Sequence, residues 1–297
     1  MSLKTTVIKV KSAFHRLESN YLPLIKGRQT ALLVFTGLAG YLSAYPAPIQ
    51  AWRLFHLIGT LFLTISGSTI INMWFDRDID AKMQRTCHRP LVTGQVKASE
   101  SLFLGLTLLI LGLGWSLSLS AVYTSIALVG TFFEIVIYTF WLKRRTAWSF
   151  LIGGLAGGMP ILGGRALALG EVDRYGLLLA LIVLLWIPTH NLSFTILRNG
   201  DYQRSGVPTF PAVYGPGATH RLIAFSSVLL AIITTIFLIS IKLVPITLYV
   251  FLAFQVGLVG LAFMTWFRSS AELSNRLFKY ATIYLLCSIF VLVANSF

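Results

Sequence analysis

Long apolar stretches dominate this chain and constrain its fold more than any other feature. An α-helix needs about 20 mostly apolar residues to cross the hydrocarbon core of a bilayer. The short alternating segments of a membrane β-barrel do not occur in the sequence. We therefore expect an all-α polytopic membrane protein, with residues 1–297 forming a single transmembrane domain. Nine stretches approximately meet the length requirement: 30–48, 54–74, 102–121, 122–140, 148–169, 177–197, 221–241, 244–266 and 278–296.

The charged residues indicate how the chain is oriented. Only 11% of residues are charged, whereas roughly a quarter are in a typical soluble domain. If the N-terminus is cytoplasmic, the 24 Lys and Arg residues lie on the cytoplasmic side with four exceptions, Arg53, Arg165, Arg174 and Lys242. This is the positive-inside pattern. The net charge of +14 is thus largely topological, and we expect a cell-membrane location, a lipid bilayer environment and no nucleic-acid partner.

The N-terminal segment 1–28 lacks the features of a signal peptide. It mixes basic and scattered apolar residues and has no apolar core or cleavage site. We expect a short helix lying on the cytoplasmic leaflet, with a targeting sequence as the less favoured alternative. Cys87 and Cys287 fall in a predicted loop and in the last span, so neither a disulfide nor a thiolate metal site is expected.

Three of the five aspartates of the chain fall within NMWFDRDIDAKMQRTCHRPL, residues 72–91. On a helix, the spacing of four places Asn72, Asp76 and Asp80 on one face, while Asp78 points elsewhere. Like charges at this spacing repel one another, and a bound cation would reverse that effect. Carboxylate and amide oxygens suit Mg²⁺, which usually binds a few carboxylates together with substrate phosphates. The pattern therefore predicts a metal site at a membrane helix end.

Arg85 and Arg89 follow this acidic segment, and guanidinium groups are well suited to phosphate oxygens. A metal, arginines and a membrane-buried cavity together indicate a lipid diphosphate, with its head at the cytoplasmic surface and its tail in the bilayer. The alternative is a solvated loop whose acids simply pair with its bases.

A second predicted cytoplasmic loop, 198–220, carries Asp201, with Arg198 three residues before it. We expect Asp201 to supply a second acidic site. His190 precedes Asp201 by about three helical turns, so both can face one cavity if the helix continues. A structural histidine is the alternative, although polar groups inside a span are costly.

The short loop 141–147 contains three consecutive cations. Lys143 lies nearest to the span and is predicted to contact the diphosphate. Arg144 and Arg145 are interpreted as topological charges that face anionic lipids.

Several motifs resemble the UbiA superfamily of intramembrane prenyltransferases, and within it the protoheme IX farnesyltransferase branch. The resemblance extends from about Lys26 to Gly217. The motifs that carry it are NMWFDRDIDAKMQRTCHRPLVTG (72–94), YTFWLKRRT (138–146), IGGLAGGMP (152–160), W-x-P-x-H (186–190) and DYxxxGxP (201–208).

This resemblance implies a nine-helix bundle around a central cavity, Mg²⁺ and an isoprenyl diphosphate, with farnesyl diphosphate as donor and heme b as acceptor. It also implies that Asn72, Asp76, Asp80 and Asp201 serve the metal. The diphosphate would be held by Arg85, Arg89, Lys143 and Arg198, with Lys26 and Arg28 lining the same pocket.

Some positions depart from the pattern of the heme branch. Members often carry an acid just before the second-loop aspartate, where this chain has Gly200, and an aromatic pair where it has Asn191 and Leu192. Arg165 and Glu134 replace aromatic or neutral residues. These changes affect the acceptor half of the site and leave the diphosphate half intact.

Glu134 lies inside a predicted span, where a carboxylate is a functional candidate. It shares a helix face with Tyr138. Its side chain either faces the reaction cavity or has a structural role, as a hydrogen-bonded or protonated carboxyl group. Direct pairing with Arg165 is not expected, because the two positions differ by roughly 16 Å in depth at 1.5 Å per residue.

The reaction implied is ionisation of the diphosphate followed by attack of an electron-rich carbon on the allylic cation. Metal and cations would stabilise the leaving group. The faces of Tyr138, Trp74 and Trp186 are candidates for stabilising the carbocation, and His190 for orienting heme or moving a proton. Three alternatives remain: a UbiA-type enzyme with an aromatic or glycerol-lipid acceptor, a UbiA-type terpene cyclase, and a membrane transporter.

Overall fold

The computed structural model describes residues 17–44, 49–241 and 245–294. Within these ranges the chain is helical and contains no strand, which confirms the predicted all-α class. Most of the predicted interfacial segment lies outside the described residues, since the description begins at Leu17. The elements in chain order are η1 (Leu17–Tyr21), η2 (Leu22–Ile25), α2 (Gly27–Leu42), α3 (Ala51–Phe75), α4 (Arg77–Lys82), α5 (Ala98–Leu117), α6 (Ala121–Thr131), η3 (Phe132–Leu142), α7 (Ser149–Gly153), α8 (Leu155–Leu169), α9 (Arg174–Leu197), α10 (Asn199–Ser205), α11 (Phe210–Ser240), α12 (Pro245–Phe267) and α13 (Ala271–Ala294).

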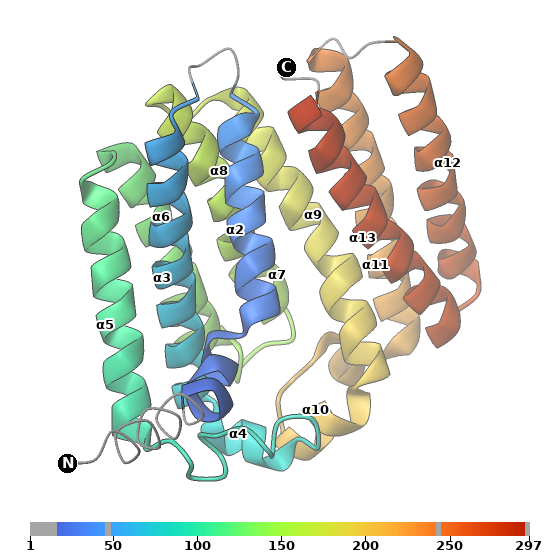
Figure 1. The fold of residues 1–297 in the computed structure, drawn as a ribbon. Helices are drawn as coiled ribbons and strands as arrows, with labels where there is room; N and C mark the ends of the chain where they lie inside the picture. The colour runs from blue at the N-terminus through green and yellow to red at the C-terminus, as the bar shows by residue number, and fades with distance from the viewer. Residues whose placement is uncertain (1–16, 45–48, 242–244, 295–297) are drawn as a thin grey trace, which may run out of the picture.

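Seven helical stretches in the described ranges are long and apolar enough to cross a membrane, which confirms a multi-pass membrane protein. They are α3, α5, α6 with η3, α7 with α8, α9, α11, and Thr247–Phe267 of α12. Helix α2, with 16 residues, and helix α13 run alongside them in the bundle (Figure 1). Many large apolar side chains on these helices are exposed, among them Phe55, Phe103 and Phe263. Such a surface suits contact with lipid.

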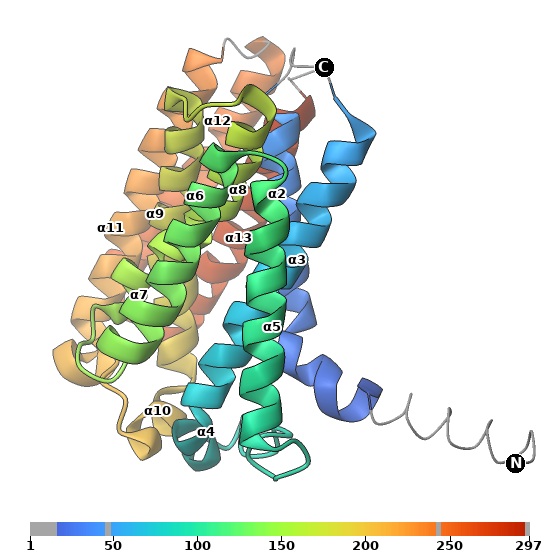
Figure 2. The same ribbon diagram turned by 90° about the vertical axis from the view of Figure 1, so that its left-hand side faces the viewer.

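The helices pack mainly against neighbours in an extended bundle. Contacts join α2 with α8, α3 with α5, α9 with α11 and α13, and α12 with α11 and α13. Figures 1 and 2 show α5 and α12 at opposite edges of this arrangement. The α2–α8 contact is backbone to backbone. A Cβ atom on Gly40 would lie 2.0 Å from the Ile161 carbonyl oxygen, and one on Gly164 would lie 1.9 Å from that of Gly37. Small residues permit such close helix approach in membranes.

Helix boundaries differ from the sequence expectation at both long loops. The predicted loop 198–220 is mostly helical: α10 occupies its first part, and α11 begins at Phe210. Helix α11 is interrupted at Gly215, whose φ of 81° and ψ of 164° are non-helical. The loop was expected because Pro and Gly punctuate it. However, Pro211 lies in the first turn of α11, where proline is tolerated.

The short helices α4 and α10 pack against each other at one end of the bundle (Figure 1). They belong to the two loops that carry the candidate acids, so the fold brings together segments separated by more than 100 positions. We refer to this as the α4–α10 end.

Arg165 lies toward the other end, where it is nearly buried. Its Nε and Nη2 atoms each donate to Asp173 at 2.8 Å, and Nη1 donates to the Ser43 carbonyl oxygen at 2.5 Å. Burial disfavours ionisation of Asp173, but the Arg165 hydrogen bonds and the Gly176 amide outweigh it and hold the pKa of this carboxyl below its usual range. Arg165 therefore ties α8 to the ends of α2 and α9, and its carboxylate partner is Asp173.

Candidate active site

The acidic segment at the end of α3 is bent at its first aspartate, Asp76. Helix α3 ends at Phe75, Asp76 has φ −89° and ψ 7°, and α4 begins at Arg77. The bend does not disturb the spacing, because the Asp80 amide still donates to the Asp76 carbonyl at 2.8 Å. Asp76 and Asp80 are buried and Asp78 is exposed. The predicted division of the three aspartates is thus present, although they do not lie on one continuous helix.

Asn72 connects this segment to η3. Its Nδ2 donates to Asp76 Oδ2 at 3.1 Å and to Thr139 Oγ1 at 2.9 Å. Its Oδ1 accepts from Lys26 Nζ at 3.1 Å. The three contacts fix the amide plane with its oxygen toward a cation.

Each buried carboxylate also faces a basic side chain. Lys143 Nζ pairs with Asp76, and Arg89 Nη1 pairs with Asp80 at 2.5 Å. A buried charge is tolerated when it is paired in this way. A cation therefore occupies one oxygen of each of these carboxylates, Asp76 Oδ2 and Asp80 Oδ2.

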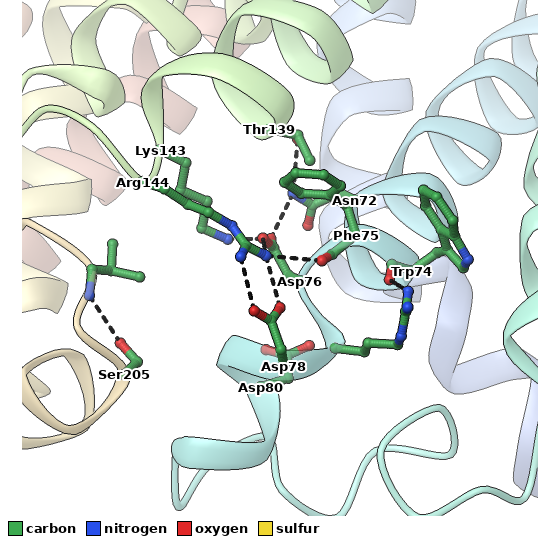
Figure 3. Close-up of polar contacts among 12 residues, drawn as sticks. Asn72, Trp74, Phe75, Asp76, Asp78, Asp80, Thr139, Lys143, Arg144 and Ser205 are labelled. Carbon is green, nitrogen blue, oxygen red and sulfur yellow. Dashed lines mark hydrogen bonds and ion pairs between the residues drawn. The ribbon is translucent and has the colours of Figure 1, made fainter.

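Asp78 has a different partner. Arg144 donates to both of its carboxylate oxygens, at 2.7 and 2.8 Å, and to the Phe75 carbonyl at 2.9 Å (Figure 3). Its hydrogen bonds hold the pKa of Asp78 below its usual range. Arg144 also lies 3.8 Å from Asp76 Oδ1. It was expected to be only a topological charge, whereas it links the short loop 141–147 to the acidic segment.

The second loop docks on the first through Asp201. Asp201 Oδ1 accepts from the Gln84 backbone amide at 3.0 Å and from Arg204 Nη2 at 2.6 Å. The Arg204 hydrogen bond, aided by the backbone amides of Gln84 and Arg85, holds the pKa of Asp201 below its usual range. The carboxylate therefore stays ionised, and the two acidic loops form one surface at the α4–α10 end.

Glu134, Tyr138 and Lys143 lie on or beside a π-helix, η3. The Lys143 amide donates to the Tyr138 carbonyl, five residues back, at 2.9 Å, and Thr139 Oγ1 donates to the Glu134 carbonyl at 2.7 Å. Stretches of π-helix often mark functional sites. The Glu134 carboxylate lies within electrostatic range of Lys26 and Lys143, and Lys143 Nζ lies 5.7 Å from the Tyr138 ring centroid. This face of η3 is directed toward the acidic segment.

Lys26 has an unusual backbone. Its φ of 47° and ψ of 54° make it the one non-glycine residue with positive φ in the described ranges. Such conformations cost about 1–3 kcal/mol and cluster at functional sites. Burial, and next the positive charge of Arg89, lower the pKa of Lys26 to about 8. The next cation, Arg28, is exposed at the start of α2.

The side chains of five other candidates lie outside this cluster of contacts. His190 is exposed and stacks on Trp186, with ring centroids 4.5 Å apart. It lies on α9 whereas Asp201 lies on α10, so the two residues are not on one continuous helix. Arg85 lies 5.4 Å from the Phe194 ring, and Arg198 is exposed. Trp74 faces away from Asp76 and holds Arg77 over its ring at 5.5 Å (Figure 3).

The donor set fits Mg²⁺ only if a substrate completes it. Among the described residues, no group of three or more His, Cys, Asp and Glu side chains is close enough to hold an ion alone. However, Asp76 Oδ1 is buried without a hydrogen-bond partner, beside the oriented Asn72 amide. A site with one or two carboxylates and open positions is typical of Mg²⁺ that also binds phosphate.

Thr139, Gln84 and Arg204 also belong to this site, and sequence reasoning missed them. Thr139 and Gln84 act through a hydroxyl and a backbone amide that carry no motif signal. Arg204 lies three residues after Asp201, a spacing at which helical side chains meet, so this pairing was accessible from the sequence.

A family model described as "UbiA prenyltransferase family" matches residues 33–286. This chain belongs to the UbiA prenyltransferase family. A protoheme IX farnesyltransferase of Korarchaeum cryptofilum is 39% identical over 246 residues, covering 83% of this chain and 81% of that protein. One from Rhodopseudomonas palustris is 35% identical over 290 residues, covering 93% and 89%. The chain is therefore a prenyltransferase.

Solved structures of the family share the fold. A digeranylgeranylglyceryl phosphate synthase matches with a TM-score of 0.79 at 22% identity, over 95% of this chain and 99% of that one. A UbiA homolog from Archaeoglobus fulgidus bound to DMAPP and Mg²⁺ matches with a TM-score of 0.66 at 15% identity, over 93% and 99%.

Proposed function

We propose that this UbiA-family prenyltransferase transfers a farnesyl group from farnesyl diphosphate to a vinyl group of protoheme IX (heme b), forming heme O. The curated relatives named above support the acceptor and the donor. The observation that carries the chemistry is the docking of Asp201 on the segment that follows Asp80, because it brings the buried acids of two loops together beside lysines and arginines.

In this proposal Asn72, Asp76, Asp80 and Asp201 hold Mg²⁺, which when bound would neutralise the diphosphate as it leaves. The cationic side chains that now contact these four residues then turn to the phosphate oxygens. Lys26, Lys143 and Arg89 are the nearest of these, and Arg28, Arg85 and Arg198 line the approach. Charge-assisted hydrogen bonds from these groups stabilise the departing diphosphate.

Loss of diphosphate leaves an allylic carbocation, which the Tyr138 ring stabilises through its face. The heme vinyl group attacks this cation, and water then adds to the resulting carbon with loss of a proton. Glu134 and His190 are the candidates for accepting that proton. Apolar helices exclude other water from the cation. The α4–α10 end faces the cytoplasm of the cell, so the soluble leaving group departs there.

One assay tests the proposal. Purified protein is incubated with Mg²⁺ and farnesyl diphosphate, with and without heme b, and diphosphate release and farnesylated heme are measured. Release that depends on heme b supports the proposal. Release without an acceptor would identify a cyclase, release only with an aromatic or glycerol-lipid acceptor would identify another transferase, and no release under any condition would favour transport.

A further inference from the structure

A small cavity adjoins the acidic site on the far side of Lys143. It has a volume of about 30 Å³ and lies among η3, the start of α7, the second half of α9 and the segment from α10 into α11. One bound water needs only about 10–15 Å³ by this measure. The cavity therefore fits a group of a few atoms, such as a carboxylate, and not a ring system.

The cavity wall is equipped for an anionic oxygen group. Its polar residues offer an ammonium from Lys143, an amide from Asn191 and hydroxyls from Thr209 and Tyr202. None of the lining residues is an aspartate or glutamate. Cations, amides and hydroxyls all donate hydrogen bonds to carboxylates.

Thr209 supplies an independent indication of a ligand. Its residue is 7% exposed, and its Oγ1 is buried without a hydrogen-bond partner. It precedes α11, where threonine usually caps the helix with its hydroxyl, yet this hydroxyl makes no cap hydrogen bond. An unmade hydrogen bond on a buried hydroxyl is costly. A group that enters the cavity can satisfy it.

Asn191 is one of the positions where the sequence departs from the aromatic pair of the heme branch. An amide there contributes a donor and leaves more space than an aromatic ring would. Asn191 therefore gives this cavity part of its polar wall.

We propose that this cavity is a subsite for a carboxylate of the acceptor, a propionate in the case of heme b. The assignment rests on the proposed function. Lys143 is shared between the two halves: it faces Asp76 on one side and lines the cavity on the other. A carboxylate bound here anchors the acceptor beside the diphosphate site, while the terminal phosphate of the donor remains with the acidic loops.

The test compares heme b with its dimethyl ester, whose propionates cannot ionise. Thr209→Val and Asn191→Leu remove the two donors at similar side-chain volume. In wild-type protein, KM should be about tenfold lower for heme b than for the ester, the effect of one good hydrogen bond to a charged group. In each variant this preference should fall severalfold because one donor to the carboxylate is lost, with KM for the ester and for farnesyl diphosphate unchanged.

Thr265→Val is the matched control, because Thr265 is buried in α12 and donates only to the Leu261 carbonyl. It should retain the preference for heme b. Heme titration by Soret absorbance separates binding from turnover and detects a misfolded variant. Equal KM values for heme b and the ester in wild-type protein overturn the subsite alone. A rise in KM for farnesyl diphosphate in the variants assigns the cavity to phosphate and also overturns it. No prenylated heme from wild-type protein overturns the proposed function, and the subsite with it.

Discussion

Asp76, Asp78 and Asp80 lie within five residues of one another and have different environments. Asp76 and Asp80 are buried beside Lys143 and Arg89, whereas the Asp78 side chain is 57% exposed and pairs with Arg144. Only the two buried carboxylates are placed to share an ion with Asn72. Different roles for the three residues follow from this placement.

We predict that Asp76→Ala and Asp80→Ala each lower the rate of diphosphate release by at least about 100-fold, as is typical when a group that stabilises transition-state charge is removed. Asp78→Asn should reduce the rate far less, because its partner Arg144 contacts it at the surface. Release of diphosphate from detergent-purified protein is the measurement, with thermal melting to verify folding. Near-normal activity in either alanine variant would show that the metal assignment is wrong.

The phase of these aspartates was predictable, since a spacing of four places residues on one side of a helix even when the helix bends. The partner of Asp78 was not. Arg144 lies 66 positions away, and a run of three basic residues at a helix end has no feature that distinguishes an ion-pairing arginine from a topological one. Only the fold determines which of the three reaches the acid.

At the scale of elements, η3 and α3 are joined by the hydrogen bond from Asn72 to Thr139. The π-helix that presents Thr139 has no signal in the sequence, because its apolar residues fit an ordinary helix equally well. The bend at Asp76 was equally hidden. Sequence reasoning therefore found the acids and missed the hydroxyl that orients their amide neighbour.

We predict that Thr139→Val increases the Mg²⁺ concentration needed for half-maximal activity by about 10- to 100-fold, the usual effect of losing a group that orients a metal ligand. The Asn72 amide would then be free to rotate its oxygen away. Mg²⁺ titration of diphosphate release is the measurement. Thr139→Ser retains the hydroxyl and should behave as wild type, and an unchanged Mg²⁺ requirement in the valine variant would contradict this role.

Arg165 makes a second connection between elements, because it joins α8 to Asp173 before α9 and to Ser43 after α2. We predict that Asp173→Asn lowers the stability of the protein by about 2 kcal/mol, because Arg165 would keep its buried charge without a carboxylate partner. This value is smaller than for a fully buried ion pair, because Asp173 is partly exposed. Asparagine still caps α9, so the change isolates the ion pair. Thermal unfolding in detergent is the measurement, and Asp78→Asn, at a more exposed pair, should have a smaller effect.

The stability difference between wild type and Asp173→Asn should depend on pH in a defined direction. Because the folded-state pKa of Asp173 is depressed, its stabilising contribution is present above the unfolded value of about 3.9 and is lost as the pH falls through the folded value. The gap in melting temperature between wild type and Asp173→Asn should be constant from pH 7 to pH 5 and narrow below about pH 4. A gap that is absent at pH 7 would exclude a stabilising ion pair.

For the whole molecule, the multi-pass character followed from apolar length, whereas the number of spans and the ends of the helices did not. Nine spans were predicted, and seven helical stretches in the described ranges are long and apolar enough to cross a membrane. Helices α4 and α10 lie where the sequence indicated irregular loops, because short polar helices carry no apolar period to detect. The meeting of these two segments could be expected only from the family resemblance. Their contact through Gln84 and Asp201 is a product of the fold.

We expect charge to set the orientation of the bundle. The segments 77–97 and 198–204, at the α4–α10 end, carry many of the lysines and arginines, and these residues are retained on the cytoplasmic side of membranes. We predict that Gln95→Cys, in the first loop, reacts with a membrane-impermeant maleimide only in inverted vesicles, and that Glu171→Cys, at the other end, reacts in intact cells. Both native residues are exposed. The background carries Cys87→Ser and Cys287→Ser, so that each protein has a single thiol.

This orientation bears on function as well as topology. A soluble diphosphate head can reach the acids only from the aqueous side on which the α4–α10 end opens, and the concentration of lysines and arginines there attracts it. The maleimide labelling and the diphosphate-release assay therefore test the same orientation. If Gln95→Cys is labelled in intact cells while the protein releases diphosphate, the acids face the outside, and a cytoplasmic source of the donor is ruled out.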